Sequence, residues 1–581
     1  MLQRPTIAKD SLRVPIKHQP LDRNVSSDSQ SIKAMPAAKS AWLPWFPLFW
    51  VVLIVGGYLY MQLGSLDQDV KNSSTVFCLG LLLFGLTGWV FLCSHYSTAK
   101  RLLWGGGPWI LVLAGVASVE LVNNGDVGVI DWRWRWSAKH DEKLSVPLGK
   151  EQIAIEWETT THDYPRFLGN GFWAEVLDVQ LATDWDEQPP VERWRCPVGA
   201  GWSGFAIVGD FAVTQEQRGS QELVVCYRVS SENPEGEIVW THADPVRFDP
   251  SGAGALGYVG PRATPAIHDG RVLTVGATGI LNCIDARSGS LLWTHDTLTE
   301  NNMQNTMWGK ACSPAILETE GKPTLVLMSV GAPSASLVAY DLETGKEVWA
   351  AGSRRSSYAS PVICELLGER QILCVNEDFV TAHSATDGKI LWEYPWQGNS
   401  DSDATASQPV PLSEDRVFLS KGYGVGASLV QLSRDESGDI LAGPLWEPPI
   451  RKVMKTKMGN VIVRDGFIYG LDGGILQCID VERGKSQWKK RRLPAIGHGQ
   501  IMAIGDNLVI LSETGELILV AIDPEEYQEL ASMSVFPSEE ITWNNPAFSS
   551  PYLLLRNAEQ AVCLKLPLAD SADVSLAHTA D

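Results

Sequence analysis

A short sequence of the form D-x-x-x-G-x-x-x-W recurs along the chain. It spans Asp285 to Trp293, Asp341 to Trp349 and Asp480 to Trp488, each time after a run of strand-forming residues. Glycine provides the positive φ that a tight turn requires, and tryptophan provides a large apolar surface that can cover a neighbouring sheet. A unit of about 40 to 50 residues with four short strands is typical of one blade of a β-propeller.

Eight such units fit into residues 190–566, at about 47 residues each. Their inner strands are predicted to begin near Gly204, Thr264, Ser313, Ser360, Gln408, Asn460, His498 and Pro546. The last unit, 551–566, stops before a fourth strand, whereas 191–196 is typical of a fourth strand without a blade before it. Because a closed ring leaves no sheet edge exposed, the two segments are predicted to share blade eight.

Two kinds of side chain recur at fixed places in these units. The tryptophans predicted to dock between blades are Trp240, Trp293, Trp349, Trp392, Trp446 and Trp488, whereas blade seven ends near Leu530 without one. The third strand carries, at one shared place, Cys226, Cys283, Cys478, Cys563, Ala339 or Ala382. A position that accepts either Cys or Ala indicates a small buried slot.

Three apolar segments precede the repeats: Trp42 to Met61, Val76 to Cys93 and Leu102 to Val119. Each is close to the ~20 residues that a helix needs to cross a bilayer. Lys and Arg are concentrated before the first segment and between the second and third, and such residues stay on the cytoplasmic side. The sequence therefore predicts a multi-pass inner (cytoplasmic) membrane protein with a cytoplasmic N-terminus and the propeller on the periplasmic or exoplasmic side.

The predicted domains are a basic, disordered cytoplasmic tail (1–40), three transmembrane helices (41–120), a membrane-proximal connector (121–189), the propeller (190–566) and a C-terminal tail (567–581). In the connector, the alternation of 131–136 (DWRWRW) favours a strand whose tryptophans pack on the propeller or at the membrane interface. The first 40 residues carry +4 and residues 41–124 are neutral, so the remainder carries −25. A region that acidic repels phosphate backbones, which argues against nucleic acid as a partner.

The D-x-x-x-G-x-x-x-W units resemble the repeats of the pyrroloquinoline-quinone (PQQ)-like propeller superfamily. The resemblance covers roughly the C-terminal two-thirds of the chain and implies an all-β, eight-bladed ring that is stabilised by tryptophans docked between blades. This fold serves both quinone enzymes and scaffolds such as the outer-membrane-protein assembly lipoprotein of the Bam complex, so the fold alone does not decide the function.

Two functions are therefore considered. A membrane-bound quinoprotein dehydrogenase would bind PQQ and calcium, and its layout of several spans before an eight-bladed ring is similar. Those enzymes build their cofactor chamber from longer loops, and alcohol-oxidising relatives carry adjacent cysteines, whereas no two of the ten cysteines here are adjacent. The favoured prediction is a non-catalytic binding or assembly scaffold that contacts the lipid bilayer and an envelope protein, without a catalytic residue, cofactor or metal site.

The linkers that lead into the inner strands carry cations within this acidic region. Because those strands begin around the axis on one face, the cations are predicted to form a positive funnel with aromatic walls. The predicted set is Arg262, Lys310, Lys421, Lys455, Lys457 and His498, with Trp308 and Tyr358 as walls. Lys421 lies in a hairpin that could open on the other face. The funnel would grip an acidic segment of a partner or a small anion, and ordinary turn composition is the alternative.

Overall fold

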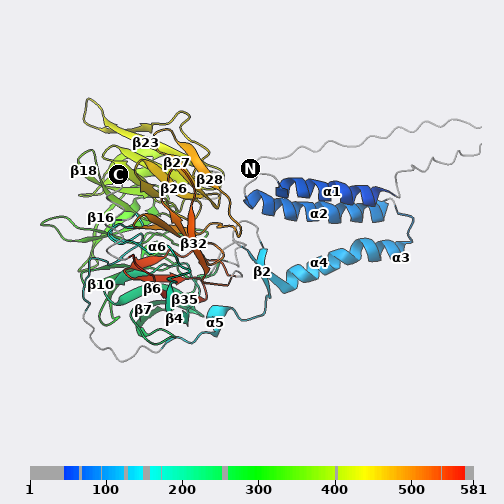
Figure 1. Ribbon diagram of the computed structural model, residues 1–581, viewed down its shortest axis with the longest axis horizontal. Coiled ribbons are helices and arrows are strands. Elements are labelled where there is room, and N and C mark those ends of the chain that lie inside the picture. The colour runs from blue at the N-terminus through cyan, green and yellow to red at the C-terminus, as the bar shows by residue number, and fades with distance from the viewer. Residues whose placement is uncertain are drawn as a thin grey trace, which may run out of the picture.

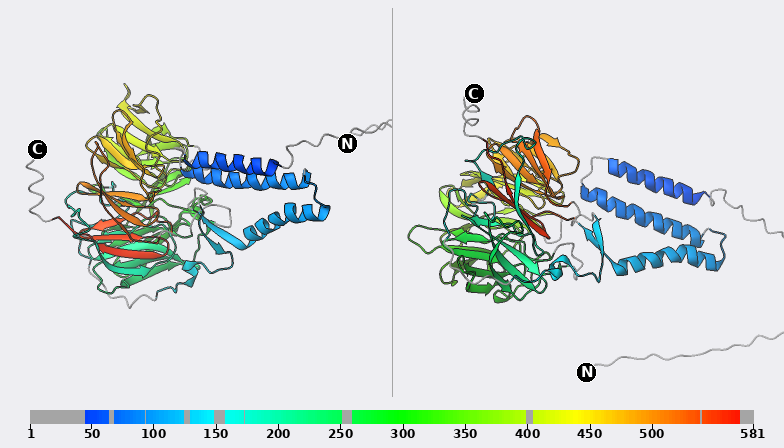
Figure 2. Two further views of the ribbon diagram at one scale, coloured as in Figure 1. Left: turned by 45° about the vertical axis from the view of Figure 1, so that its right-hand side comes forward. Right: turned by 60° about the horizontal axis from the view of Figure 1, so that its bottom comes forward.

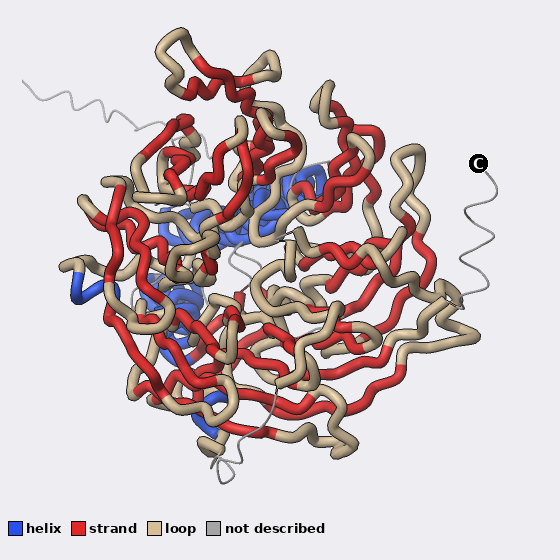
Figure 3. The backbone as a smooth tube through the Cα atoms, turned by 90° about the vertical axis from the view of Figure 1, so that its left-hand side faces the viewer, coloured by secondary structure: helices blue, strands red, loops and turns tan. Residues whose placement is uncertain are grey.

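The chain forms a set of apolar helices followed by eight β-sheets around a common axis. The computed structural model describes residues 45–63, 68–92, 94–123, 129–147, 157–171, 173–250, 259–398, 404–537 and 540–569. Figure 3 looks along the axis, with the sheets surrounding it and the helices behind. The predicted N-terminal tail (1–40) and most of the predicted C-terminal tail lie outside the described residues.

Each blade contains four antiparallel strands, as predicted, and the sheet of blade seven has a fifth strand beside them. Blades one to four consist of β5 (Ala206–Val208), β6 (Phe211–Arg218), β7 (Gln221–Arg228) and β8 (Ile238–Asp244); β9 (Ala266–His268), β10 (Arg271–Val275), β11 (Ile280–Asp285) and β12 (Leu291–Asp296); β13 (Ala315–Leu317), β14 (Leu325–Ala332), β15 (Ala335–Asp341) and β16 (Glu347–Ala351); and β17 (Val362–Leu366), β18 (Glu369–Val375), β19 (Phe379–Ser384) and β20 (Ile390–Pro395).

Blades five to eight follow the same order from the axis outward. They consist of β21 (Val410–Ser413), β22 (Arg416–Lys421), β23 (Gly426–Arg434) and β24 (Ile440–Pro444); β25 (Ile462–Arg464), β26 (Phe467–Asp472), β27 (Ile475–Asp480) and β28 (Lys485–Lys490); β29 (Gln500–Ile504), β30 (Asn507–Leu511), β31 (Glu516–Ala521) and β32 (Glu529–Ser534); and β33 (Ala547–Ser549), β34 (Tyr552–Arg556), β35 (Gln560–Lys565) and β4 (Val191–Pro197). The predicted inner-strand starts immediately precede the observed ones.

The ring closes in blade eight, where the first propeller strand completes the last sheet. Strand β4 pairs with β35, and Trp194 lies opposite Cys563. A buried ionic network crosses the seam to blade one: Arg556 donates to the carbonyls of Gly199 and Gln215, and the Glu216 carboxylate accepts from Arg218. The predicted closure by the chain start is therefore confirmed, and it removes the free sheet edge.

The repeated motif is the contact between neighbouring blades. Trp240 of blade one donates its Nε1 hydrogen to the Ala286 carbonyl of blade two at 2.9 Å. Gly289 of blade two lies on the same indole at a φ of 70°, and a Cβ there would stand 2.8 Å from the ring. The Asp285 side chain fixes this turn by accepting from the Ser288 amide at 2.8 Å. The turn of one blade thus rests on the tryptophan of the preceding blade.

The same contact recurs around the ring with local variation. Four more tryptophans donate their Nε1 hydrogen to a carbonyl of the next blade: Trp194, Trp293, Trp446 and Trp488. Trp392 instead donates to Gln371 of its own blade, and Trp349 packs against Gly388. In blade seven, Ala531 lies opposite Leu519, where six of the other blades place tryptophan. This accounts for the missing Trp near Leu530.

The shared position in the third strands is the predicted small slot. Each of these Cys or Ala residues lies opposite a docking tryptophan in the sheet register, as Cys226 does with Trp240 and Ala339 with Trp349. Cys226, Ala339 and their counterparts have no exposed surface. A larger side chain there would displace the neighbouring tryptophan.

The N-terminal part contains the helices α1 (Phe46–Leu63), α2 (Gln68–Leu92), α3 (Thr98–Arg101) and α4 (Gly107–Ser118), with the π-helical turn η1 (Leu102–Gly106) between the last two. In the described part of the chain, Phe46–Leu63 and Ser73–Leu92 are long and apolar enough to cross a membrane. The third predicted span is helical as far as Ser118, and it begins with the π-helical turn η1, which contains Gly105 and Gly106. The helices pack together, since Trp50 donates to the Leu81 carbonyl and Trp109 to Thr87.

A hairpin of β1 (Val119–Asn123) and β2 (Val129–Trp134) follows α4 and confirms the strand predicted around 131–136. Trp134 and Trp136 are 45% and 70% exposed and stack on each other with ring centroids 5.2 Å apart. Three short elements complete the fold: α5 (His140–Lys143), α6 (Thr297–Glu300) and β3 (Glu175–Val176).

Because tryptophans dock on the glycine turn of the next blade, replacing a docked tryptophan should reduce stability much more than replacing an exposed one. Trp240→Ala should lower the free energy of unfolding by ~3–5 kcal/mol, because it leaves a cavity beneath Gly289. Trp136→Ala should have a much smaller effect on the propeller, because its ring is 70% exposed. Denaturant unfolding of the full chain, followed by circular dichroism of the sheets, measures both. Equal losses of unfolding free energy in the two variants would contradict the docking of Trp240 between blades.

Candidate functional site: a pocket at one end of the propeller axis

The helical part is fixed to one face of the propeller through α5. The Gly219 amide, in the turn between β6 and β7, donates to the Asp141 carbonyl, and His140 contacts the carbonyl of Val198 in the linker before β5. This face, here called the linker face, is therefore formed by the linkers and by the turns between second and third strands. The helices project from it (Figures 1 and 2).

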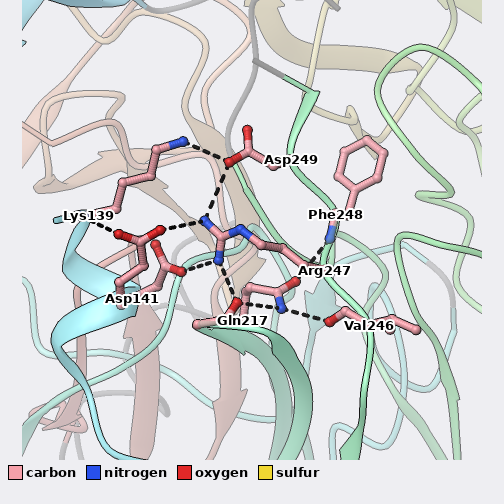
Figure 4. A network of polar contacts seen from close by, with 9 residues as sticks. Lys139, Asp141, Gln217, Val246, Arg247, Phe248 and Asp249 are labelled. Atoms are coloured by element: carbon pink, nitrogen blue, oxygen red, sulfur yellow. Dashed lines mark hydrogen bonds and ion pairs between the residues drawn. The ribbon is translucent and has the colours of Figure 1, made fainter. Parts of the chain in front are cut away.

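Figure 4 shows the polar network that holds this attachment. Arg247 Nη1 lies 2.5 Å from Asp141 Oδ2 and also donates to the Gly219 carbonyl. Lys139 forms an ion pair with Asp249 at 2.8 Å. Asp141 is 2% exposed, so its contacts with Arg247 are shielded from water, and the network fixes α5 on blade one.

A pocket with about 970 Å³ of empty space lies on the axis at the linker face. Its lining comes from the linkers of seven blades, the first residue of β29 in blade seven, one hairpin and the connector: Phe167, Trp202, Arg262, Trp308, Ala311, Tyr358, Ser360, Ala404, Ala406, Gln408, Tyr423, Lys457, Met458, Gln500, Trp543 and Asn545. Six aromatic side chains, two cations and three amides therefore face one space.

Arg262 is one of the two cations on the lining, and its guanidinium lies between two aromatic rings. Its guanidinium carbon lies 5.0 Å from the Trp202 ring centroid and 4.8 Å from that of Phe248. Burial lowers the pKa of Arg262 to about 10, while the charge of Glu222 opposes that shift. Arg262 therefore remains cationic at neutral pH. Phe248 follows Arg247 directly, so the α5 attachment also supports the pocket wall.

Lys457 provides the second cation on the lining. Its Nζ lies 4.9 Å from the Tyr423 ring centroid. The predicted walls Trp308 and Tyr358 also line the pocket, with their ring centroids 5.5 Å apart. The structure thus brings together four of the residues predicted for the funnel.

Two of the predicted cations point elsewhere, which corrects the six-cation funnel. Lys310 is 3% exposed, and its Nζ donates to the carbonyls of Ser329 and Val330 and to the Ser356 hydroxyl. Lys421 is 1% exposed and donates to the Trp396 carbonyl at 2.7 Å. Both ammonium groups bind backbone carbonyls, because a buried cation requires such partners.

Lys455 and His498 lie in the linkers as predicted but are not among the lining residues. Their backbone amides are held by acidic side chains, Lys455 by Asp472 at 2.6 Å and His498 by Glu513 at 3.1 Å. These contacts shape the linkers of blades six and seven.

The polar residues just before the inner strands form a relay around the axis. The Gly204 amide donates to Thr264 Oγ1, the Thr264 amide to Ser313 Oγ, and the Ser313 amide to Ser360 Oγ. In the same way, the Gln408 amide donates to Asn460. Much of the polar composition of the linkers therefore satisfies buried backbone groups.

The connector forms the floor of the pocket. Tyr164 pairs with Ile207 of blade one, Phe167 lines the pocket, and β3 adds a parallel strand to the inner strand β29 of blade seven. Leu168 is 4% exposed. Phe167 also lines a smaller cavity with Ser313 and Pro314, so it separates the pocket from the far side of the axis. The pocket therefore opens toward the linker face.

Sequence reasoning missed several walls of the pocket. Phe167 lies outside the repeats, and no pattern in the connector marks it. Trp202 and Trp543 stand just before inner strands, as Trp308 does, so aromatic residues at that place were an available signal. Their ring centroids are 4.8 Å apart.

The lining offers binding groups but fits a calcium-dependent quinone site poorly. Calcium prefers carboxylate and carbonyl oxygens, and a general base must reach the substrate. The described lining residues contain amides and hydroxyls but no Asp, Glu, His or Cys. In the described ranges, no group of three or more His, Cys, Asp and Glu residues could hold a metal ion. Asp401 and Asp403, a D-x-D pair, lie outside those ranges.

The repeats match those of known proteins. A family model described as outer membrane protein assembly factor BamB matches residues 227–490. The dehydrogenase subunit of alcohol dehydrogenase (quinone) from Acetobacter aceti is 24% identical over 215 residues, 35% of this chain and 28% of that protein. The C-terminal region is a PQQ-like β-propeller.

Other similarities to this PQQ-like propeller are of the same kind. Quinohemoprotein alcohol dehydrogenase ADH-IIG from Pseudomonas putida is 25% identical over 144 residues, 23% of this chain and 19% of that protein. The chain thus spans less than a third of the length of these two curated relatives. The structure of BamB from Moraxella catarrhalis aligns with a TM-score of 0.43 and 12% identity, covering 65% of this chain and 100% of that one.

Glu222 near the pocket should make stability depend on pH. Burial raises its pKa from 4.5 to about 7, and the Ala277 amide and Arg262 only partly oppose this. The folded state therefore binds a proton that the unfolded state has lost, so the propeller loses stability as the pH rises from about 4.5 to about 7.

Glu222→Gln should remove this loss. We expect the variant to melt at a higher temperature than the parent above pH 7 and at a similar temperature near the ordinary carboxyl pKa. Glu365→Gln, at a carboxylate that is 67% exposed, serves as the control and should leave the profile unchanged. A constant offset between Glu222→Gln and the parent at every pH would contradict this assignment.

Proposed function

We propose that the protein is a membrane-anchored PQQ-like propeller that acts as a non-catalytic binding or assembly scaffold of the cell envelope. Its ligand is an acidic segment of a protein partner or a small anion, held in the pocket at the linker face. Arg262 and Lys457 provide the charge, and Trp308 and Tyr358 provide apolar walls. Anchoring is supported by the two apolar helices, and a partner in the envelope by the BamB family model.

The composition of the lining is the observation that carries this proposal. The pocket combines two cations with six aromatic rings, which suits binding of an anionic group through charge and stacking. Its described lining has no acidic side chain, thiol or imidazole to move a proton, attack a substrate or ligate calcium. Those groups suffice for recognition and do not provide the machinery of a dehydrogenase.

A quinoprotein dehydrogenase is the second candidate, because the curated relatives include quinone-dependent alcohol dehydrogenases. It would require PQQ and calcium. We expect no dye-linked alcohol or sugar oxidation by the full chain after PQQ and calcium are added. Turnover above a quinone-free control would establish the enzyme and overturn the scaffold proposal.

Removing the two pocket charges should abolish partner capture. The variant Arg262→Gln with Lys457→Gln should retain at most roughly a tenth of the partner that the tagged full chain captures from solubilised envelopes, since a buried charge contact contributes about 2–5 kcal/mol. Lys457 is replaced rather than Lys310, because the Lys310 ammonium binds the buried carbonyls of Ser329 and Val330 and its loss would destabilise the fold.

The matched control is Arg483→Gln with Lys485→Gln, which removes the same charge on the outer side of blade six. It should capture as much partner as the parent. Melting curves verify that both variants keep the ring intact. Equal capture by the pocket variant and the control would show that the partner binds elsewhere.

We further propose that the propeller lies on the periplasmic or exoplasmic side of the inner membrane, with three passes through α1, α2 and the α3–α4 segment. The basic flanks support this orientation. Alkaline phosphatase fused after residue 136 should be active, whereas a fusion between α2 and α3 should be inactive. The reverse pattern would place the propeller in the cytoplasm.

A further inference from the structure

A basic segment, Lys489 to Leu493, follows the outer strand of blade six in a region of net charge −25. Its flanking cations are neutralised: Lys489 lies 2.5 Å from Asp472, and Arg492 binds Glu516 and Glu529 at 2.6 and 2.8 Å. Lys490 and Arg491 are exposed and form no ion pair within the described part of the chain. Two positive charges are therefore available to a partner.

An exposed apolar residue accompanies these charges. Leu493 is 94% exposed, the highest value among the large apolar side chains of the described residues. Cationic groups beside an exposed leucine can meet a surface that is negatively charged outside and apolar beneath. A bilayer with anionic lipids has that chemistry, whereas an aqueous anion would leave Leu493 uncovered.

The segment lies on the linker face. Lys490 pairs with Leu476, next to the turn between β26 and β27, so β28 ends at the level of that turn. The equivalent turn of blade one holds Gly219, which binds α5. Lys490, Arg491 and Leu493 therefore lie on the face from which α1 and α2 project (Figure 1).

A second feature marks the level of the bilayer surface. Trp134 and Trp136 lie beside the end of α4, because Trp134 pairs with Val119 and the Arg135 amide donates to the Ser118 carbonyl. Both side chains are exposed, and their rings stack on each other. Exposed tryptophans near the end of an apolar helix are typical of the headgroup region of a membrane. The linker face is thus the part of the propeller nearest to the expected membrane surface.

We propose that Lys490, Arg491 and Leu493 form a contact with the anionic headgroups of the membrane that α1 and α2 enter. This inference rests on the membrane anchoring in the proposed function but not on the identity of the pocket ligand. The contact adds a second attachment, on blade six, to the one that α5 makes on blade one. Two attachments hold the pocket opening toward the bilayer, so a ligand reaches it from the membrane side.

A spin label on residue 493 tests this contact in the full chain. Leu493→Cys carries a nitroxide, and the protein is reconstituted into nanodiscs of phosphatidylcholine alone or with added phosphatidylglycerol. The labelled parent chain gives the background from the native cysteines, most of which are buried in the described part of the chain. Collisions with dissolved oxygen and with a water-soluble nickel chelate report the depth of the label. Leu177→Cys, 58% exposed after β3, is the matched position.

We expect phosphatidylglycerol to raise oxygen access and lower nickel access at residue 493 and to leave residue 177 unchanged. Lys490→Glu with Arg491→Glu should cancel the effect. Arg483→Glu with Lys485→Glu, an equal charge reversal at the opposite end of β28, should preserve it. Co-migration of each variant with the discs verifies that the helices are inserted.

Three results would overturn the proposal. The first is a spin label at residue 493 that lies at the same depth as one at residue 177. The second is a label depth at residue 493 that does not change when phosphatidylglycerol is added. The third is a label immobilised in native membranes but not in any lipid disc, which would assign the segment to a protein partner. A failure of disc insertion would instead contradict the anchoring of the proposed function, so the two failures are distinguishable.

Discussion

The contact between a tryptophan and the glycine turn of the next blade is the interaction on which this structure depends. Each sheet has two apolar faces, and a single blade cannot cover either of them alone. The docked indole covers the outer part of the interface, while its Nε1 hydrogen usually binds a carbonyl of the next turn. Gly289 and its counterparts leave room for the ring. The repeat therefore builds the contacts between neighbouring blades.

A ring assembled in this way places all eight linkers around one end of the axis. The relay through Thr264, Ser313 and Ser360 fixes the linker backbones, so the side chains between them can form a pocket. The connector then closes the floor with Phe167. Because α5 attaches the helices to the same face, the geometry links the anchoring of the chain with the direction in which its pocket opens.

The features that repeat along the chain could be predicted from the sequence. The period and the Asp, Gly and Trp positions predicted the blades, the small slot at Cys226 and the closure through Trp194, because these follow from strand geometry. Individual side-chain directions were less predictable. Lys310 and Lys457 both lie before inner strands, yet one binds buried carbonyls and the other faces the pocket. Phe167 could not be placed, because its contact depends on the path of the connector rather than on a local pattern.

We propose that the partner binds in the pocket rather than on the outer strands, and site-specific photo-crosslinking in cells tests this most directly. A benzophenone amino acid replaces Trp308 in the pocket wall or Leu292, which is 49% exposed on the outer strand β12. We predict a covalent adduct from position 308 that disappears when Arg262 and Lys457 are neutralised, and none from position 292. Adducts from position 292 alone would contradict the account.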